Sequence, residues 1–196
     1  MKYWTECDFS DVTYTTSKAR SKKVEYLNLE AGFDIETSSV ELEGKKSAFM
    51  YVWMFGIGYG KEVYYGRTWE ELKAFTSKFV EHFNLSQNRR LVVYIHNLSY
   101  EFQFMRHHFN WTDMFNLKVR KPLKATTVDG IEFRDSFILS GYGLEKTGEN
   151  LIHHNVAKLV GELDYTKVRH HNTPLTEQEL AYCENDIKII TAYINE

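Results

Sequence analysis

The stretch that most constrains this chain runs from Phe33 to Thr37 and reads FDIET, with apolar and acidic residues in alternation. A period of two is typical of a β-strand, and it places Asp34 and Glu36 on one face of a sheet. Two neighbouring carboxylates repel each other and are costly to bury. A divalent cation that takes oxygen ligands, such as Mg²⁺ or Mn²⁺, removes that repulsion. The pair alone predicts either a metal site or a solvated strand edge, and the rest of the chain decides between them.

Length and composition favour one globular domain. The chain has 196 residues, 43% of them hydrophobic, and this is enough for one substantial core. The net charge of −3 does not by itself indicate nucleic-acid binding. It does not exclude it either, because a cluster of metal-binding carboxylates would lower the net charge of a protein that also has a basic surface. Residues 1–23 are polar with a basic cluster, so we expect an N-terminal arm that is either irregular or in contact with nucleic acid. Residues 24–196 make up the predicted domain.

The sequence has no feature of a secreted or membrane protein. Its first residues lack the apolar core of a signal peptide, and its longest apolar run, 48–58, is too short to span a bilayer. Cys7 and Cys183 lie at opposite ends of the chain without metal-ligand spacing, which indicates reduced thiols. We therefore expect a soluble cytoplasmic protein without a membrane partner.

Hydrophobic periodicity predicts a mixed α/β sheet flanked by helices. Strands are expected at 24–37, 48–58, 61–66 and 91–95, and two or three more between 114 and 135 with a turn at Asp129-Gly130. Helices are expected from Thr68 to about 84, at 100–109 after a Ser99 cap, and from a Thr176–Glu179 capping box to about 193.

Four polar islands fall on these elements. They are Asp34 with Glu36, HNLSYE at 96–101, Asp135-Ser136, and YCEND at 182–186. Within the last island, Tyr182 and Asp186 are four residues apart and share a helix face. Each island alone has an ordinary explanation, such as surface polarity or an acid in the first turn of a helix. Their joint occurrence, in order and on these elements, favours the metal site.

The order and character of the islands resemble the 3′–5′ exonuclease domain of family B DNA polymerases, above all the protein-primed branch of tailed phages and linear plasmids. The resemblance runs from Gly32 to the carboxy terminus. It implies an RNase H-like α/β fold, in which helices flank a mixed β-sheet, and a site for two Mg²⁺ or Mn²⁺ ions. It also implies a proofreading exonuclease that acts on single-stranded DNA 3′ ends, located in the host cytoplasm if phage-encoded.

The partners implied by the resemblance are a single-stranded DNA 3′ end, a polymerase domain in cis or in trans, and a terminal protein. The sequence contains no tyrosine-aspartate-threonine-aspartate polymerase motif, so we expect no polymerase activity from these residues. Two other functions stay open at this point. One is a related ribonuclease, and the other is a non-catalytic module that binds single strands or docks a partner.

The resemblance assigns catalytic roles by motif position. Asp34 would bridge both ions, Glu36 and Asp186 would complete the first, and Tyr182 would orient the attacking water. Glu101 stands where the family more usually has aspartate, and its extra methylene puts the geometry of the second ion in question. Lys158 is the nearest match to a family lysine that assists the scissile phosphate; a solvated surface lysine explains it equally well.

Other positions match residues that grip the frayed strand by hydrogen bonds and stacking. They are Thr37, His96, Asn97, Tyr100, Phe104, Ser136 and Phe137. Core packing explains Phe104 and Phe137 equally well. For Asn97 a role in binding is favoured, because it follows a predicted strand and α/β sheets bind ligands where strands end. The basic stretches 118–124 and 167–171 either line a DNA channel or are solvated faces.

Overall fold

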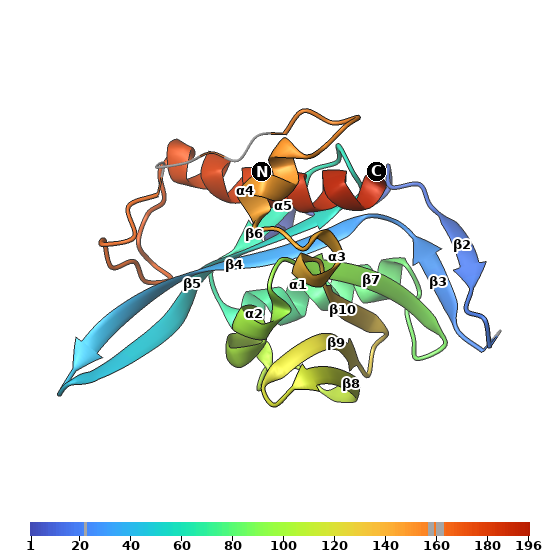
Figure 1. Cartoon of the computed structure of the whole chain (residues 1–196), viewed down its shortest axis with the longest axis horizontal. Coiled ribbons are helices and arrows are strands. Elements are labelled where there is room, and N and C mark those ends of the chain that lie inside the picture. The colour runs from blue at the N-terminus through green and yellow to red at the C-terminus, as the bar shows by residue number, and fades with distance from the viewer. Residues whose placement is uncertain (22, 157–158, 160–162) are drawn as a thin grey trace.

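The strand that carries Asp34 and Glu36 lies inside a mixed sheet with helices on both faces (Figure 1). The computed structural model describes residues 1–21, 23–156, 159 and 163–196. In it, β4 (Ala31–Leu42) pairs antiparallel with β5 (Lys45–Ile57) and parallel with β7 (Arg89–Ile95). The strand order is β1-β6-β5-β4-β7-β10-β9-β8, and β3 attaches β2 to β7. The other strands are β1 (Lys2–Tyr3), β2 (Thr15–Lys18), β3 (Glu25–Asn28), β6 (Val63–Gly66), β8 (Trp111–Lys118), β9 (Lys121–Thr127) and β10 (Ile131–Asp135).

Two long helices cover opposite faces of the sheet. Both α1 (Trp69–His82) and α5 (Glu177–Asn195) begin with a capping box. The box of Thr176 and Glu179 was predicted, whereas for Thr68 only the cap was predicted and Glu71 completes the box. The shorter helices are η1 (Trp4–Glu6), α2 (Leu98–Met105), α3 (Phe137–Ser140) and α4 (Leu144–Glu149). No helix in the described ranges is both long and apolar enough to cross a membrane.

Side chains alternate between the two faces of the sheet, as the sequence predicts for β4. Ala31, Phe33 and Ile35 belong to the hydrophobic core under α1, together with Phe75 and Phe79 of that helix. Asp34 and Glu36 therefore point to the face that α5 covers. The aromatic residues of α1 thus recur at helical spacing and pack into this core.

The structure corrects three expectations about secondary structure. The predicted strand 24–37 is two strands, β3 and β4, which follow one another along the same edge of β7. The described part of the N-terminal segment is not a loose arm: β1 pairs with β6, β2 pairs with β3, and Phe9 is buried among the aromatics of α1. Helix α2 spans 98–105 rather than 100–109, and its N-cap is Asn97 rather than Ser99. The domain boundary at residue 23 stays a prediction.

Candidate metal and nucleic-acid site

Three carboxylates converge between strand β4 and helix α5. One ligand oxygen from each of Asp34, Glu36 and Asp186 lies within 4.8 Å of the others. Glu36 and Asp186 are buried and Asp34 is half-buried. The sheet brings the first two together by their spacing, and the helix adds the third from a distant part of the chain. This cluster suits a hard divalent cation, which takes carboxylate oxygens as ligands.

Close contact between α5 and the sheet fixes the position of Asp186. A Cβ added to Gly56 on β5 would lie 2.5 Å from Cγ2 of Ile187, so only glycine lets the helix approach this closely. Ile187 and Ile190 are fully buried against this face of the sheet. Since the residue next to Asp186 is locked in this way, the carboxylate has little freedom to move away from β4.

Glu101, the fourth predicted ligand, lies beside Asp34. It is buried on α2, and burial, followed by the negative charge of Asp34, raises the pKa of Glu101 well above its ordinary value. A side-chain hydrogen bond joins the two carboxyls. Within the described residues, Oε2 of Glu101 is buried without a hydrogen-bond partner. A buried carboxyl oxygen without a hydrogen-bond partner is unfavourable, and beside an acidic cluster it is suited to bind a metal ion.

Tyr182 lies one helical turn before Asp186, with its hydroxyl in the field of the acidic cluster. Burial first, and then the charges of Asp186, Glu36 and Asp34, raise the pKa of Tyr182 to about 12. Its hydroxyl is 2.8 Å from the hydroxyl of Tyr165, which hydrogen-bonds to it. Tyr182 is therefore a neutral hydroxyl group at physiological pH, held beside the carboxylates.

The predicted strand-gripping residues gather along the edge where β7 and β10 end. The hydroxyls of Thr37 and Tyr100 are 2.6 Å apart, and the rings of Tyr100 and Phe104 are 5.2 Å apart. Tyr100 is 43% exposed, so its ring has a free surface. These contacts join β4 to α2 directly beside Asp34 and Glu36.

The remaining members lie at the N-terminal end of α2. Nδ1 of His96 is 3.2 Å from Oγ of Ser136, and the His96 ring lies edge-on to Phe137 at 5.6 Å. Asn97 is exposed and adopts a left-handed conformation with φ of 79°. Asparagine tolerates this conformation better than most residues, and here it turns the chain from β7 into α2.

Asp135 has a structural role that the sequence did not reveal. Its two carboxylate oxygens accept the N–H groups of Leu98 and Ile138, each at 2.9 Å. It therefore ties the first residue of α2 to α3 and fixes the position of Ser136. The parallel pairing of Ile95 with Asp135 brings these segments together, and such pairing is not visible in a local pattern. Lys158 lies outside the described residues.

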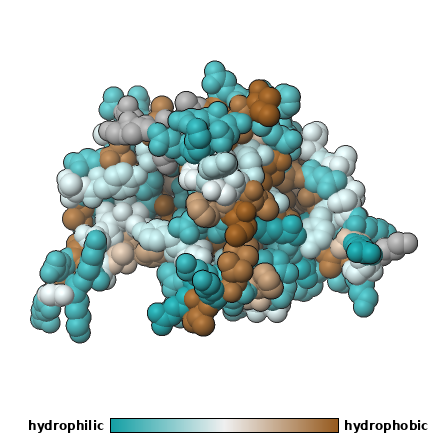
Figure 2. Space-filling model, viewed as in Figure 1, coloured by the Kyte–Doolittle hydropathy of each residue, from teal (hydrophilic) through white to brown (hydrophobic). Residues whose placement is uncertain are grey.

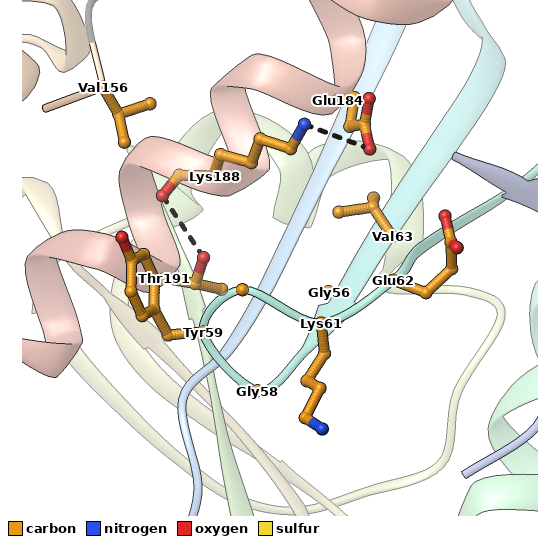
Figure 3. A pocket seen from close by; sticks show the side chains of 11 residues that line it. Gly56, Gly58, Tyr59, Lys61, Glu62, Val63, Val156, Glu184, Lys188 and Thr191 are labelled. Carbon is orange, nitrogen blue, oxygen red and sulfur yellow. Dashed lines mark hydrogen bonds and ion pairs between the residues drawn. The ribbon is translucent and has the colours of Figure 1, made fainter. Parts of the chain in front are cut away.

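A separate cavity of about 330 Å³ lies behind α5, lined by the 58–60 turn and by Glu184, Lys188 and Thr191 (Figure 3). On a helix, positions 184 and 188 point away from 182 and 186. Lys188 and Glu184 pair with each other at 3.3 Å. The cavity thus lies on the opposite side of the helix from the acidic cluster and contains none of the predicted site residues.

The comparison with solved structures confirms the expected fold. The chain matches Phi29 DNA polymerase complexed with primer-template DNA and incoming nucleotide substrates, with a TM-score of 0.66 and 19% identity over 85% of this chain. It also matches Phi29 DNA polymerase complexed with single-stranded DNA, with a TM-score of 0.63 and 19% identity over 84% of this chain. No family model matches the sequence, and no curated protein matches it.

In both of these matches the chain covers 30% of the polymerase chain. The fold is therefore that of one part of a DNA polymerase: a mixed α/β sheet flanked by helices, as the RNase H-like exonuclease resemblance implied. At 19% identity the likeness establishes the fold and leaves activity to the residues of the site.

Proposed function

We propose that this chain is a 3′–5′ exonuclease domain that hydrolyses single-stranded DNA from its 3′ end with the help of two Mg²⁺ or Mn²⁺ ions. The observation that carries the proposal is the convergence of Asp34, Glu36 and Asp186 within 4.8 Å, with the buried carboxyl of Glu101 beside them. The proposed context is proofreading beside a polymerase domain in cis or in trans, with a terminal protein as a further partner.

The donor set fits two divalent ions. Asp34 belongs to the cluster with Glu36 and Asp186 and is also hydrogen-bonded to Glu101, so it is the residue that would serve both ions. When bound, such ions activate a water and stabilise the leaving 3′ oxygen. A bound cation would favour the ionised form of Glu101, because it replaces the repulsion from Asp34 with attraction.

The chain itself would orient the reactants. Tyr182, neutral and hydrogen-bonded by Tyr165, is suited to hold the attacking water by its hydroxyl. Thr37 and Asn97 offer hydrogen bonds to the terminal nucleotide, and Tyr100 and Phe104 offer a stacking surface. Ser136 is buried and would take part by holding the His96 ring through its hydroxyl. The proposed nucleic-acid-binding set is completed by His96 and Phe137, which are in contact with each other.

A surface next to this site suits a single strand. Figure 2 shows apolar side chains gathered over α3 and the hairpin of β8 and β9. The exposed residues of these elements include Phe137 on α3 and Phe115 and Leu117 on β8. The hairpin segment 111–127 contains four basic residues and one acidic residue, so its charge is +3, whereas the whole chain has a net charge of −3. Exposed aromatics among cations are the features that bind unpaired strands without sequence preference.

The proposal is tested with a 5′-labelled single-stranded DNA oligomer, incubated with Mg²⁺, Mn²⁺ or EDTA, beside Asp34→Ala. We expect a metal-dependent ladder that shortens from the 3′ end and is absent in the variant. A matched RNA oligomer in parallel distinguishes the related ribonuclease. Absence of a ladder at any metal concentration would refute the exonuclease.

One observation favours a second candidate, a non-catalytic module that binds single strands. Glu101 is longer than the aspartate expected at its position, and burial followed by the charge of Asp34 raises its pKa in the ion-free protein, which disfavours the ionised form that an ion needs. A decayed second-ion site would leave strand binding intact without cleavage. Strand binding in EDTA, no ladder with Mg²⁺ or Mn²⁺, and recovery of cleavage in Glu101→Asp would together support this candidate.

A further inference from the structure

A β-bulge lies directly beside the acidic cluster. Along the pair of β4 and β5, Glu36 is opposite Val52 and Thr37 is opposite Met50, so Tyr51 is the extra residue. In a regular strand, Tyr51 and Val52 would point to opposite faces. Here both belong to the cluster packed against α5, whereas Met50 and Trp53 belong to the core under α1. The bulge thus turns Tyr51 towards the face that carries Glu36.

The hydroxyl of Tyr51 is buried there without a partner. The side chain is 1% exposed, and no hydrogen bond to its oxygen is found within the described residues. Burial first, and then the charge of Glu36, raise the pKa of Tyr51, so the group is a neutral O–H donor at any physiological pH. An unsatisfied buried hydroxyl is destabilising, and a fold keeps one where it has another use.

The groups around Tyr51 leave Glu36 as its acceptor. The guanidinium of Arg169 lies 5.7 Å from the ring centroid, and it cannot accept a hydrogen bond. Glu179 is engaged by Arg169 and by the N–H of Thr176. The Cys183 thiol is a weak acceptor. Glu36 is the charged acceptor on the same face, on the strand paired with β5 at the bulge.

We propose that Tyr51 is a positioning residue of the ion site: its hydroxyl donates to the Glu36 carboxylate, directly or through one water, when the site is loaded. The inference rests on the proposed function, because it concerns the same ions. A hydrogen bond on the outer oxygen of a ligating carboxylate fixes the rotamer of that carboxylate, and loss of such a partner typically weakens metal affinity by about 10- to 100-fold.

The test compares Tyr51→Phe with wild type in Mn²⁺ titration calorimetry and in thermal unfolding of the ion-free protein. We expect Mn²⁺ affinity to fall about tenfold or more. We also expect the ion-free melting temperature to stay the same or rise, since the variant removes an unsatisfied buried hydroxyl. A merely structural tyrosine would show the opposite pattern.

Tyr64→Phe is the matched control. Tyr64 lies in the same sheet, is 4% exposed, and donates its hydroxyl proton to the carbonyl of Asp8 at 2.8 Å. Its variant should melt at a lower temperature and bind Mn²⁺ as wild type does. Wild-type affinity in Tyr51→Phe, or an equal loss in both variants, would overturn the inference alone. Failure of the wild type to bind Mn²⁺ would overturn the proposed function and the inference together.

Discussion

Arg169 anchors the segment before α5, and its replacement tests how the helix that carries Asp186 is held. The residue is 2% exposed. Its guanidinium donates twice to Glu179, at 2.9 and 2.5 Å, and also to the carbonyls of Asp164 and Lys167, at 2.7 and 3.1 Å. Glu179 in turn caps the start of α5. Arg169→Met therefore leaves a buried carboxylate and two carbonyls without their donor.

Removing one member of a buried, hydrogen-bonded ion pair typically costs about 3–5 kcal/mol. For a chain of this size, 1 kcal/mol shifts the melting temperature by about 2–4 °C, so we expect Arg169→Met to melt roughly 10 °C lower or more. Urea unfolding at pH 7 measures the free energy directly. The exposed pair of Lys146 and Glu149 provides the control: Lys146→Ala should change stability by less than about 0.5 kcal/mol.

A double variant and the pH dependence of stability test the role of the Arg169–Glu179 pair further. The double variant Arg169→Met with Glu179→Gln should regain most of the loss, because glutamine still caps α5 and carries no charge. Although burial opposes it, the N–H of Thr176 and the Arg169 guanidinium lower the pKa of Glu179. The pair therefore stabilises the fold above the unfolded pKa of about 4.3, and this contribution is lost as pH falls through the folded pKa. A loss below about 1 kcal/mol at pH 7 would refute this account.

Three other predictions concern the site and the turns. In EDTA, the contribution of Glu101 to stability is most favourable below its unfolded pKa of about 4.3 and is lost as pH rises through its raised folded pKa; urea unfolding of wild type and Glu101→Gln at several pH values should show this difference in slope. Tyr182→Phe should slow cleavage about a hundredfold while leaving Mn²⁺ affinity unchanged; an unchanged cleavage rate would exclude Tyr182 from the mechanism. Gly130→Ala should cost more than about 2 kcal/mol, since φ is +92° and a Cβ would meet a backbone oxygen at 2.3 Å; Gly44→Ala, with φ of +73° and nothing within 4 Å, should cost only about 1 kcal/mol.

Local patterns were enough to predict the elements that carry the acidic cluster. The alternation around Asp34 determined which face of β4 is acidic, and the capping box at Thr176 located the start of α5. The spacing of Tyr182 and Asp186 then placed both side chains on the face that meets the sheet. These features depend on residues a few positions apart, so the sequence displays them directly.

Features that depend on distant pairing were not predictable in this way. The bulge at Tyr51 is a change of register between two strands, and a hydrophobic pattern does not show which residue is skipped. The role of Asp135 depends on parallel pairing with β7. The burial of Phe9 depends on packing against Phe75 of α1, more than sixty residues later, and the polar composition of the N-terminal segment does not show this contact.

The central claim is that Asp34, Glu36, Glu101 and Asp186 form one site for two divalent ions. Anomalous diffraction from crystals soaked in Mn²⁺ tests it most directly. The account predicts two peaks about 4 Å apart, one among Asp34, Glu36 and Asp186 and the other between Asp34 and Glu101. A single peak would remove Glu101 from the ion site. The absence of any peak among the three converging carboxylates would contradict the claim itself.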